Sequence, residues 1–236
     1  MMMPLRSHLL ALLSLGGSLL GGSALAHVSV VSPAFAGTTQ EITFNIAHGC
    51  AGADTLSLQI EIPAEVTAVR TVSSTLGPAV VSYNEAELVS AVTWTKPEAE
   101  LLSADTSYYK VVLRLKIPNT PLTQLHFLAH QVCKVPGGET TTVDWVSLEP
   151  NTGEGGAEPA PALTIMPPRV PGWNKVTVPV ALATADLTTY FGDAAIVWKG
   201  TAAFSANPNT SAQIAATSGV TALTALGVGD EIWVKY

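Results

Sequence analysis

The sequence predicts an all-β protein with a small mixed segment at its C-terminal end. Between residues 27 and about 165, short runs rich in Val, Ile, Leu and Thr alternate with polar residues and are broken by Gly, Pro, Asn or Ser. This is the pattern of half-buried strands, and no helical period competes with it there. After Pro171 the pattern changes and includes short helical stretches. Strands of this length and spacing favour an antiparallel β-sandwich of the immunoglobulin type, followed by a C-terminal α+β appendage.

The predicted strands of the first domain, residues 27–165, follow one another at short intervals. They cover residues 27–31, 41–47, 55–62, 66–73, 80–83, 91–95, 108–117, 124–132 and 140–147. Residues 150–162, rich in Gly, Pro and Glu, predict a linker or an irregular edge.

The appendage, residues 166–236, is predicted to mix helix and strand. Residues 186–192 predict a short helix that Asp186 caps and Gly192 ends. A second helix is expected over 209–217 and a final strand over 231–236. Nothing in this part of the sequence indicates its role.

Residues 1–26 have the features of a signal peptide. Arg6 precedes an apolar run over residues 9–20, and residues 24–26 (ALA) give the small-x-small pattern at which such peptides are cut. The run is interrupted by glycines and is shorter than the roughly 20 apolar residues that span a bilayer. We therefore expect an exported protein, periplasmic or secreted, without a membrane anchor.

Charge and composition restrict the classes of partner. The chain has 11 basic and 18 acidic residues, a net charge of −7 at pH 7, and loss of Arg6 with the leader makes it more negative. An acidic protein of this kind is not expected to bind nucleic acid or anionic lipid. With 47% hydrophobic and 12% charged residues, a packed core is expected rather than disorder. No nucleophilic triad, phosphate loop or carboxylate pair indicates an enzyme.

Cleavage after Ala26 would make His27 the first residue of the mature chain. Its α-amine, with an ordinary pKa of about 7.7–8.0, and its imidazole Nδ1 could then chelate one metal ion, which displaces the amine proton. A second imidazole would complete a T-shaped set of three nitrogens, a histidine brace, which suits the tetragonal preference of Cu(II). The alternative is that His27 is only the residue that cleavage leaves.

The sulfur-containing residues also favour Cu(II). Cys50 and Cys133 are the two cysteines, and in an exported chain such a pair predicts a disulfide, with metal ligation by thiolates as the alternative. Met166 is the one methionine outside the predicted leader. Because Cu(I) sites use thioether or thiolate ligands, a copper site in this chain is expected to use nitrogen and to favour Cu(II).

His48 is the candidate for the second imidazole. It stands in the segment HGC at the end of a predicted strand, just before Cys50. A Cys50–Cys133 bridge would hold His48 against the strand that carries Gln131, and Trp145 falls on the next strand. A rigid scaffold of this kind suits a ligand. The alternative is a histidine that forms local hydrogen bonds at a turn.

His126 and His130 are less suited to bind metal. Both are placed on one face of the strand predicted over 124–132, about 13 Å apart from the rise per residue, so they cannot share one ion. His130 could act as an outer group near the site. Otherwise both are expected to be surface or partly buried residues of the sandwich.

Six segments occur in an order that resembles the YcnI-like family, once classed as a domain of unknown function. They are HVSVVSP, HGCAGADT, IEIPAEV, VTWTKPE, HFLAHQVC and VDWVSLEP, within residues 27–165. The resemblance implies an immunoglobulin-like sandwich and an exported copper-binding domain. Some members pair one histidine with a carboxylate. His48 stands at the carboxylate's position, so the resemblance implies a two-histidine brace of His27 and His48, with Trp145 beside the metal.

We therefore expect a copper(II) carrier, buffer or chaperone of copper homeostasis, not an enzyme, with other periplasmic copper-handling proteins as possible partners. One alternative is a histidine-brace monooxygenase that oxidises polysaccharides. Such enzymes add an axial Tyr or Phe and a flat aromatic face, and the scattered Tyr and Phe residues give no such cluster. The other is a structural or adhesive sandwich without metal. Trp145 is expected to pack against the open side of a planar copper site, or else to be an ordinary core residue.

Overall fold

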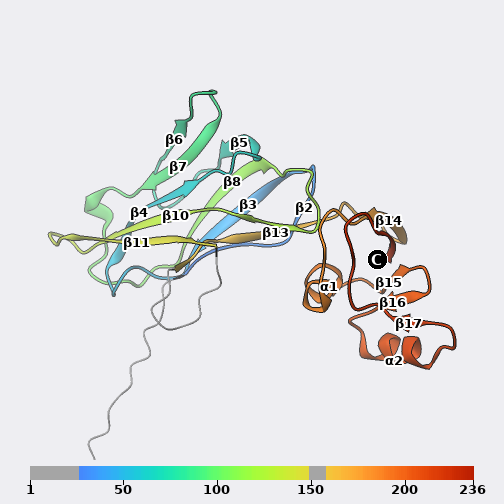
Figure 1. The fold of residues 1–236 in the computed structure, drawn as a ribbon. Coiled ribbons are helices and arrows are strands. Elements are labelled where there is room, and N and C mark those ends of the chain that lie inside the picture. The colour runs from blue at the N-terminus through green and yellow to red at the C-terminus, as the bar shows by residue number, and fades with distance from the viewer. Residues whose placement is uncertain (1–26, 149–157) are drawn as a thin grey trace, which may run out of the picture.

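The structure, a computed structural model, describes residues 27–148 and 158–236. The predicted signal peptide and most of the predicted linker lie outside this part of the chain. Figure 1 shows a large β-sandwich and a smaller C-terminal unit beside one end of it.

The sandwich is built from sheets that pack on a shared core. One sheet has the order β1 (Val28–Val30), β3 (Thr39–Ile46), β8 (Tyr109–Lys116), β5 (Thr67–Thr71). The sheet that packs against it has the order β12 (Glu158–Pro159), β11 (Thr140–Ser147), β10 (Ala129–Lys134), β4 (Asp54–Glu61), β7 (Val89–Thr95), β6 (Ala79–Tyr83). A short sheet at one end has the order β2 (Ala34–Phe35), β13 (Ala162–Met166), β9 (Thr123–His126), and a 3-10 turn covers Glu98–Glu100.

Buried and exposed residues alternate along the strands, which explains why the sheets pack face to face. In β8, residues 109, 111, 113 and 115 are buried and their neighbours are more exposed, as expected when one face of a strand packs on the core. Phe44 of β3 meets Phe127 edge to face, with ring centroids 5.1 Å apart. The predicted fold class is confirmed: antiparallel pairing dominates, and the short pairs β11–β12 and β2–β13 are parallel.

The prediction of one strand over 124–132 is wrong. The chain leaves the short sheet after His126 and enters the sandwich sheet at Ala129. Between them the amide of Phe127 donates to the carbonyl of Pro161, and the Phe127 ring is buried. His126 and His130 therefore lie on different strands in different sheets, and not on one face of one strand.

The C-terminal unit has a sheet of its own and a core of its own. Its sheet has the order β14 (Trp173–Thr177), β18 (Glu231–Lys235), β15 (Ile196–Lys199), β16 (Ala202–Phe204), β17 (Thr221–Ala222). Helix α1 (Thr184–Phe191) packs Leu187 and Phe191 into this core. Asp186 accepts a hydrogen bond from the amide of Ala183 at 2.8 Å, so it caps the helix from inside the first turn instead of preceding it. Helix α2 (Pro208–Ala216) is capped by Asn207, whose side chain accepts from the amides of residues 209 and 210.

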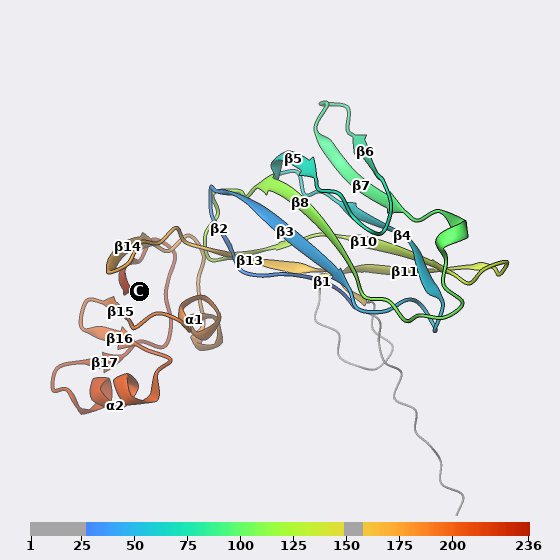
Figure 2. The ribbon, with the colours of Figure 1, turned by 180° about the vertical axis from the view of Figure 1, so that it is seen from behind.

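The two units share an apolar seam. Leu122 and Met166 of the sandwich are buried in the C-terminal core, and Phe35 packs against it. The Arg169 guanidinium lies over the rings of Phe35 and Tyr236, at 5.0 and 4.6 Å from their centroids. Figure 2 shows the C-terminal unit next to the end of the sandwich that carries β2 and β13. In residues 27–148 and 158–236, no helix has the length and apolar character needed to cross a membrane.

Candidate metal centre

His27 lies just before β1, beside the end of β3. The two strands are antiparallel, with Val28 opposite Ile46, and the amide of Ala47 donates to the carbonyl of His27 at 3.4 Å. His27 is therefore opposite the residue that precedes His48. Backbone pairing brings the two histidines, which are well separated in the sequence, to one corner of the sandwich.

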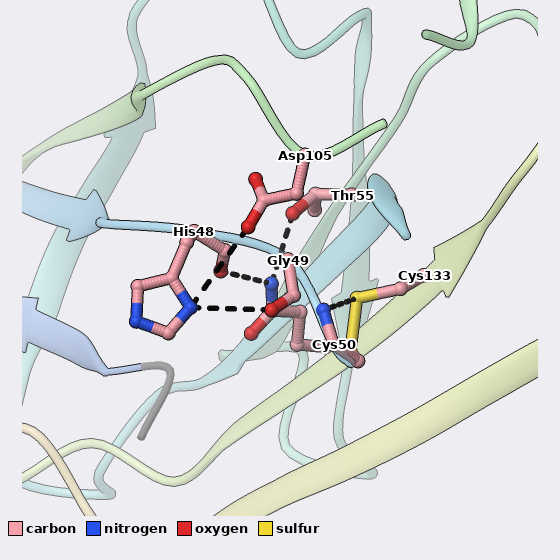
Figure 3. Close-up of a disulfide and its surroundings, with 7 residues drawn as sticks. His48, Gly49, Cys50, Thr55, Asp105 and Cys133 are labelled. Carbon is pink, nitrogen blue, oxygen red and sulfur yellow. Dashed lines mark hydrogen bonds and ion pairs between the residues drawn. A yellow bond between two sulfur atoms is a disulfide. The ribbon is translucent and has the colours of Figure 1, made fainter. Parts of the chain in front are cut away.

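The backbone of His48 is fixed from two sides. Its carbonyl accepts a hydrogen bond from Nε2 of Gln131 at 3.1 Å, and the buried Gln131 also donates to Thr55 Oγ1 at 2.8 Å. Just beyond, Cys50 forms a disulfide with Cys133, with 5.6 Å between their Cα atoms. The predicted disulfide is confirmed, and it ties the HGC turn to β10 (Figure 3).

Glycine is required within the HGC segment. A Cβ on Gly49 would lie 1.7 Å from the carbonyl oxygen of Ala53, so any side chain would force the turn apart. The tight turn places His48 on one side and Cys50 on the other, as Figure 3 shows.

The imidazole of His48 has one nitrogen engaged by its surroundings. Nδ1 lies 3.3 Å from the Gly49 carbonyl and 3.9 Å from an Asp105 carboxylate oxygen. Figure 3 shows the other ring nitrogen on the side away from Asp105. A proton on Nδ1 is favoured by these oxygens and leaves the Nε2 lone pair available to a metal. The side chain of His48 is 30% exposed, so the imidazole is partly accessible to solvent.

Trp145 lies against His27. It is fully buried on β11, opposite Ala129 of β10. Its ring centroid is 5.6 Å from that of His27, and the ring planes are tilted by 38°. The structure thus gathers His27, His48 and Trp145 at the end of the sandwich where the described chain begins.

His130 is bound on both sides of its ring. Nδ1 lies 2.7 Å from Asp144 and Nε2 lies 2.9 Å from Glu61. Burial disfavours the charged imidazole, but the bonds to Asp144 and Glu61 outweigh it and raise the pKa of His130. With both nitrogens engaged, His130 is not suited to bind a metal. His126 lies on β9, in the other sheet.

Comparison with known families gives this arrangement a context. Residues 27–165 match the family described as "Domain of unknown function (DUF1775)". The chain belongs to this family. A search of curated proteins gave no match.

Solved structures give partial likenesses to the DUF1775 chain. An uncharacterized protein from Nocardia farcinica, described as having an immunoglobulin-like fold, is 24% identical over 59% of this chain and 97% of its own, with a TM-score of 0.49. A non-cellulosomal cohesin from Archaeoglobus fulgidus is 13% identical over 60% of this chain and 91% of its own, with a TM-score of 0.32. A cohesin from Acetivibrio cellulolyticus in complex with a dockerin is 13% identical over 56% and 92%, with a TM-score of 0.30.

A buried ionic network supports the loop that carries Asp105 in the DUF1775 domain. Lys96 Nζ lies 2.6 Å from Asp54 Oδ2, and the Tyr109 hydroxyl donates to Asp54 Oδ1 at 2.7 Å and also bonds to Lys96. Asp54 Oδ2 further accepts from the amide of Leu102 at 2.9 Å. This last bond fixes the start of the loop that leads to Asp105, whose amide donates to the Gly52 carbonyl.

Both charged groups of this network have shifted pKa values. Burial disfavours the Asp54 carboxylate, but hydrogen bonds from Leu102, Lys96 and Tyr109 outweigh it and lower its pKa. Burial likewise disfavours the charged form of Lys96, but Asp54 and Tyr109 outweigh it and raise its pKa. Both groups are therefore ionised at neutral pH and stabilise each other.

Sequence reasoning did not identify Asp105, Asp54 or Lys96 as parts of this site. Asp54 and Lys96 lie within the segments HGCAGADT and VTWTKPE that carry the family resemblance. Their position within those segments was the one signal that the sequence offered. The pairing of Asp54 with Lys96, which are far apart in the chain, becomes visible only with the strand register. Asp105 lies in LLSADTSY, a loop that carries no motif.

The donor set of the DUF1775 domain suits a metal that prefers nitrogen. Among the described residues, no group of three or more His, Cys, Asp or Glu is placed to hold a metal with side chains alone. His27 and His48 offer imidazoles, and the third nitrogen of a brace, the α-amine, arises only when the chain is cut before His27. Within the described ranges, Gln131 Oε1 and Trp145 Nε1 are buried polar atoms without a hydrogen-bond partner. Of these two, Gln131 Oε1 can accept a hydrogen bond or face a cation, whereas the Trp145 N–H can only donate.

Proposed function

We propose that this protein is an exported copper(II)-binding protein of copper homeostasis, acting as a carrier, buffer or chaperone and not as an enzyme. Its ligands would be the α-amine and Nδ1 of His27 and Nε2 of His48. One observation carries the proposal: the pairing of His27 with Ala47 puts both histidines at one corner that a disulfide holds in place. The leader-like segment 1–26 and the YcnI-like segments support export and copper binding.

The surrounding residues have distinct roles in this proposal. The carboxylate of Asp105 and the carbonyl of Gly49 hold the proton of His48 on Nδ1, because each lies on that side of the ring. Trp145 lies beside the ring of His27 and has no lone pair for a metal, its indole N–H being a donor. An indole there would exclude water and favour storage or transfer over oxygen chemistry. Metal content and Cu(II) EPR of the chain that begins at His27 test the proposal directly.

His48 and His130 give a matched pair of variants. His48→Ala deletes an inner imidazole, so Cu(II) affinity should fall by at least about tenfold and one nitrogen should disappear from the hyperfine pattern. His130→Ala should change neither, because both of its nitrogens are bound to carboxylates. EPR and competition titration measure both effects. A larger loss of Cu(II) affinity in His130→Ala than in His48→Ala would show that the metal binds near His130, and it would contradict the assignment of His48 as a ligand.

Tryptophan fluorescence tests the position of Trp145. Cu(II) should quench it strongly, and Trp145→Phe should remove most of the copper-dependent quenching. The other four tryptophans give the background fluorescence: Trp173, Trp198 and Trp233 belong to the C-terminal unit, and Trp94 is buried on β7. Trp94→Phe is the control and should leave the quenching in place. Quenching that survives Trp145→Phe would show that Trp145 is only a core residue.

A further inference from the structure

The outer face of the C-terminal sheet carries a row of indoles, which we name the tryptophan face: Trp173, Trp198 and Trp233. The three residues lie on neighbouring strands, in the order β14, β18, β15. Trp198 is directly opposite Trp233. Trp173 is opposite Lys235, the next outward position along β18 from Trp233. Directly opposite and diagonal neighbours lie within reach of aromatic side chains, so the indoles form a continuous oblique row across the sheet.

The strand pattern shows that these indoles do not belong to the core. On each strand the inward positions include a buried Val or Ile, namely Val176, Ile232, Val234 and Val197. The indoles occupy the outward positions, where Trp173 and Trp233 are each 49% exposed. The three side chains line an open hollow of about 480 Å³. Large apolar side chains gathered on the solvent face of a sheet are typical of a binding surface.

The charges beside the row decide which ligand it can accept. Lys175 and Glu231 lie on the same face and neutralise each other across 2.6 Å, and Lys235 lies 5.9 Å from the Trp173 ring centroid. A cationic ligand, which aromatic cages otherwise favour, would meet these lysines. A polyanion would find Lys175 already paired with Glu231 and would approach a chain of net charge −7. The face is thus complementary to an uncharged ligand with apolar surfaces and hydrogen-bonding edges.

We propose that the tryptophan face binds an uncharged polysaccharide. Pyranose rings present an apolar C–H surface that stacks on an indole, and hydroxyl groups at the ring edge that can reach Lys175, Glu231 and the indole N–H groups. A row that crosses three strands suits consecutive units of an extended glycan chain. Anionic lipid is disfavoured by the acidic chain. A proline-rich peptide, which also docks on aromatic residues, is separated from a glycan by the test below.

The experiment uses the whole chain from His27 to Tyr236. Binding is measured by depletion on cellulose, chitin and insoluble β-1,3-glucan, and by fluorescence with soluble hexasaccharides of the same sugars. We expect binding to at least one of these glycans. Trp233→Ala should weaken it about tenfold or more, and Trp233→Phe should retain much of it because a stacking ring remains. Tyr83→Ala is the control: Tyr83 is 64% exposed on β6 of the sandwich, and its loss should change nothing.

The outcomes separate this proposal from its rivals and from copper binding. Failure to bind all three glycans, glycan binding that Trp233→Ala leaves intact, or preferential binding to phosphatidylglycerol vesicles or decaproline would each overturn it. Should Trp233→Ala lower the thermal midpoint of unfolding, Trp173→Ala on the edge strand β14 replaces it. Copper titration of Trp233→Ala should match that of the unaltered chain, since His27 and His48 belong to the sandwich.

Discussion

The four residues Gly-Pro-Gly-Pro placed before His27 should lower the affinity for Cu(II) by at least about 100-fold, more than the loss of an outer partner of a metal ligand does. The prolines keep the new terminal amine from closing another chelate ring with the imidazole of His27. The extension converts the α-amine into an amide, which removes one of the three proposed nitrogens and opens the chelate ring on His27. The imidazoles of His27 and His48 remain, so weak binding with an altered EPR spectrum should persist. Competition titration and EPR on chains whose N-termini are verified by mass spectrometry measure the difference.

The matched control for this extension is the same four residues added after Tyr236. It adds the same mass at the far end of β18, in the C-terminal unit, and should leave copper binding unchanged. If the chain extended before His27 keeps the tight affinity and the original spectrum, the amine is no ligand and the brace is refuted. Because the α-amine must lose its proton to bind, affinity of the unextended chain should rise with pH through the neutral range.

Lys96→Met should lower the free energy of unfolding by about 3–5 kcal/mol, the range for a buried ion pair that loses one partner. The reason is that Asp54, fully buried, would keep its charge with only Tyr109 and the Leu102 amide as partners. Urea denaturation measures the change. The control is Lys134→Met, which breaks the outer pair with Glu98 and should alter stability by no more than about 1 kcal/mol. Equal effects of the two variants would contradict this account.

The same network predicts how stability depends on pH. The folded-state pKa of Asp54 is lowered, so its contribution is present above the ordinary carboxyl pKa and is lost as pH falls below about 4. The folded-state pKa of Lys96 is raised, so its contribution is present below the ordinary lysine pKa and is lost as pH rises above about 10. The unaltered chain should show both losses in urea denaturation. Lys96→Met should not show the loss of stability above about pH 10, because that loss comes from Lys96.

Strand alternation explains how much of the fold could be predicted. Strands such as β3 and β8 are half buried, so their burial follows a period of two that is visible in the sequence. The break after His126 was not visible, because QLHFLAHQV runs without a turn residue. The chain changes sheets there because Phe127 bonds to Pro161, a partner much further along the chain. Local pattern cannot show a choice between two sheets.

The candidate site divides in the same way. His27, His48 and Trp145 lie in segments with recognisable patterns, so the sequence could indicate them. Asp105 approaches His48 only through a loop held by Asp54 and Gly52. The tryptophan face likewise needs the register of β14, β18 and β15, which joins the two ends of the C-terminal unit. These features depend on long-range pairing, which one sequence does not display.

The stretch of chain that defines the family is shorter than the stretch that folds as one piece. The family match ends at residue 165, while β13 runs on to Met166, whose side chain is buried in the C-terminal core together with Leu122. A fragment that ends at residue 165 would lack Met166 and would expose Leu122 and Phe35 to water, and it would become prone to aggregation. The two units therefore pack against each other and are not independent domains joined by a linker. Arg169 is paired with Asp193 and lies over two aromatic rings, so it stabilises the junction between the units. A ligand bound to the tryptophan face would therefore hold the sandwich in one fixed orientation.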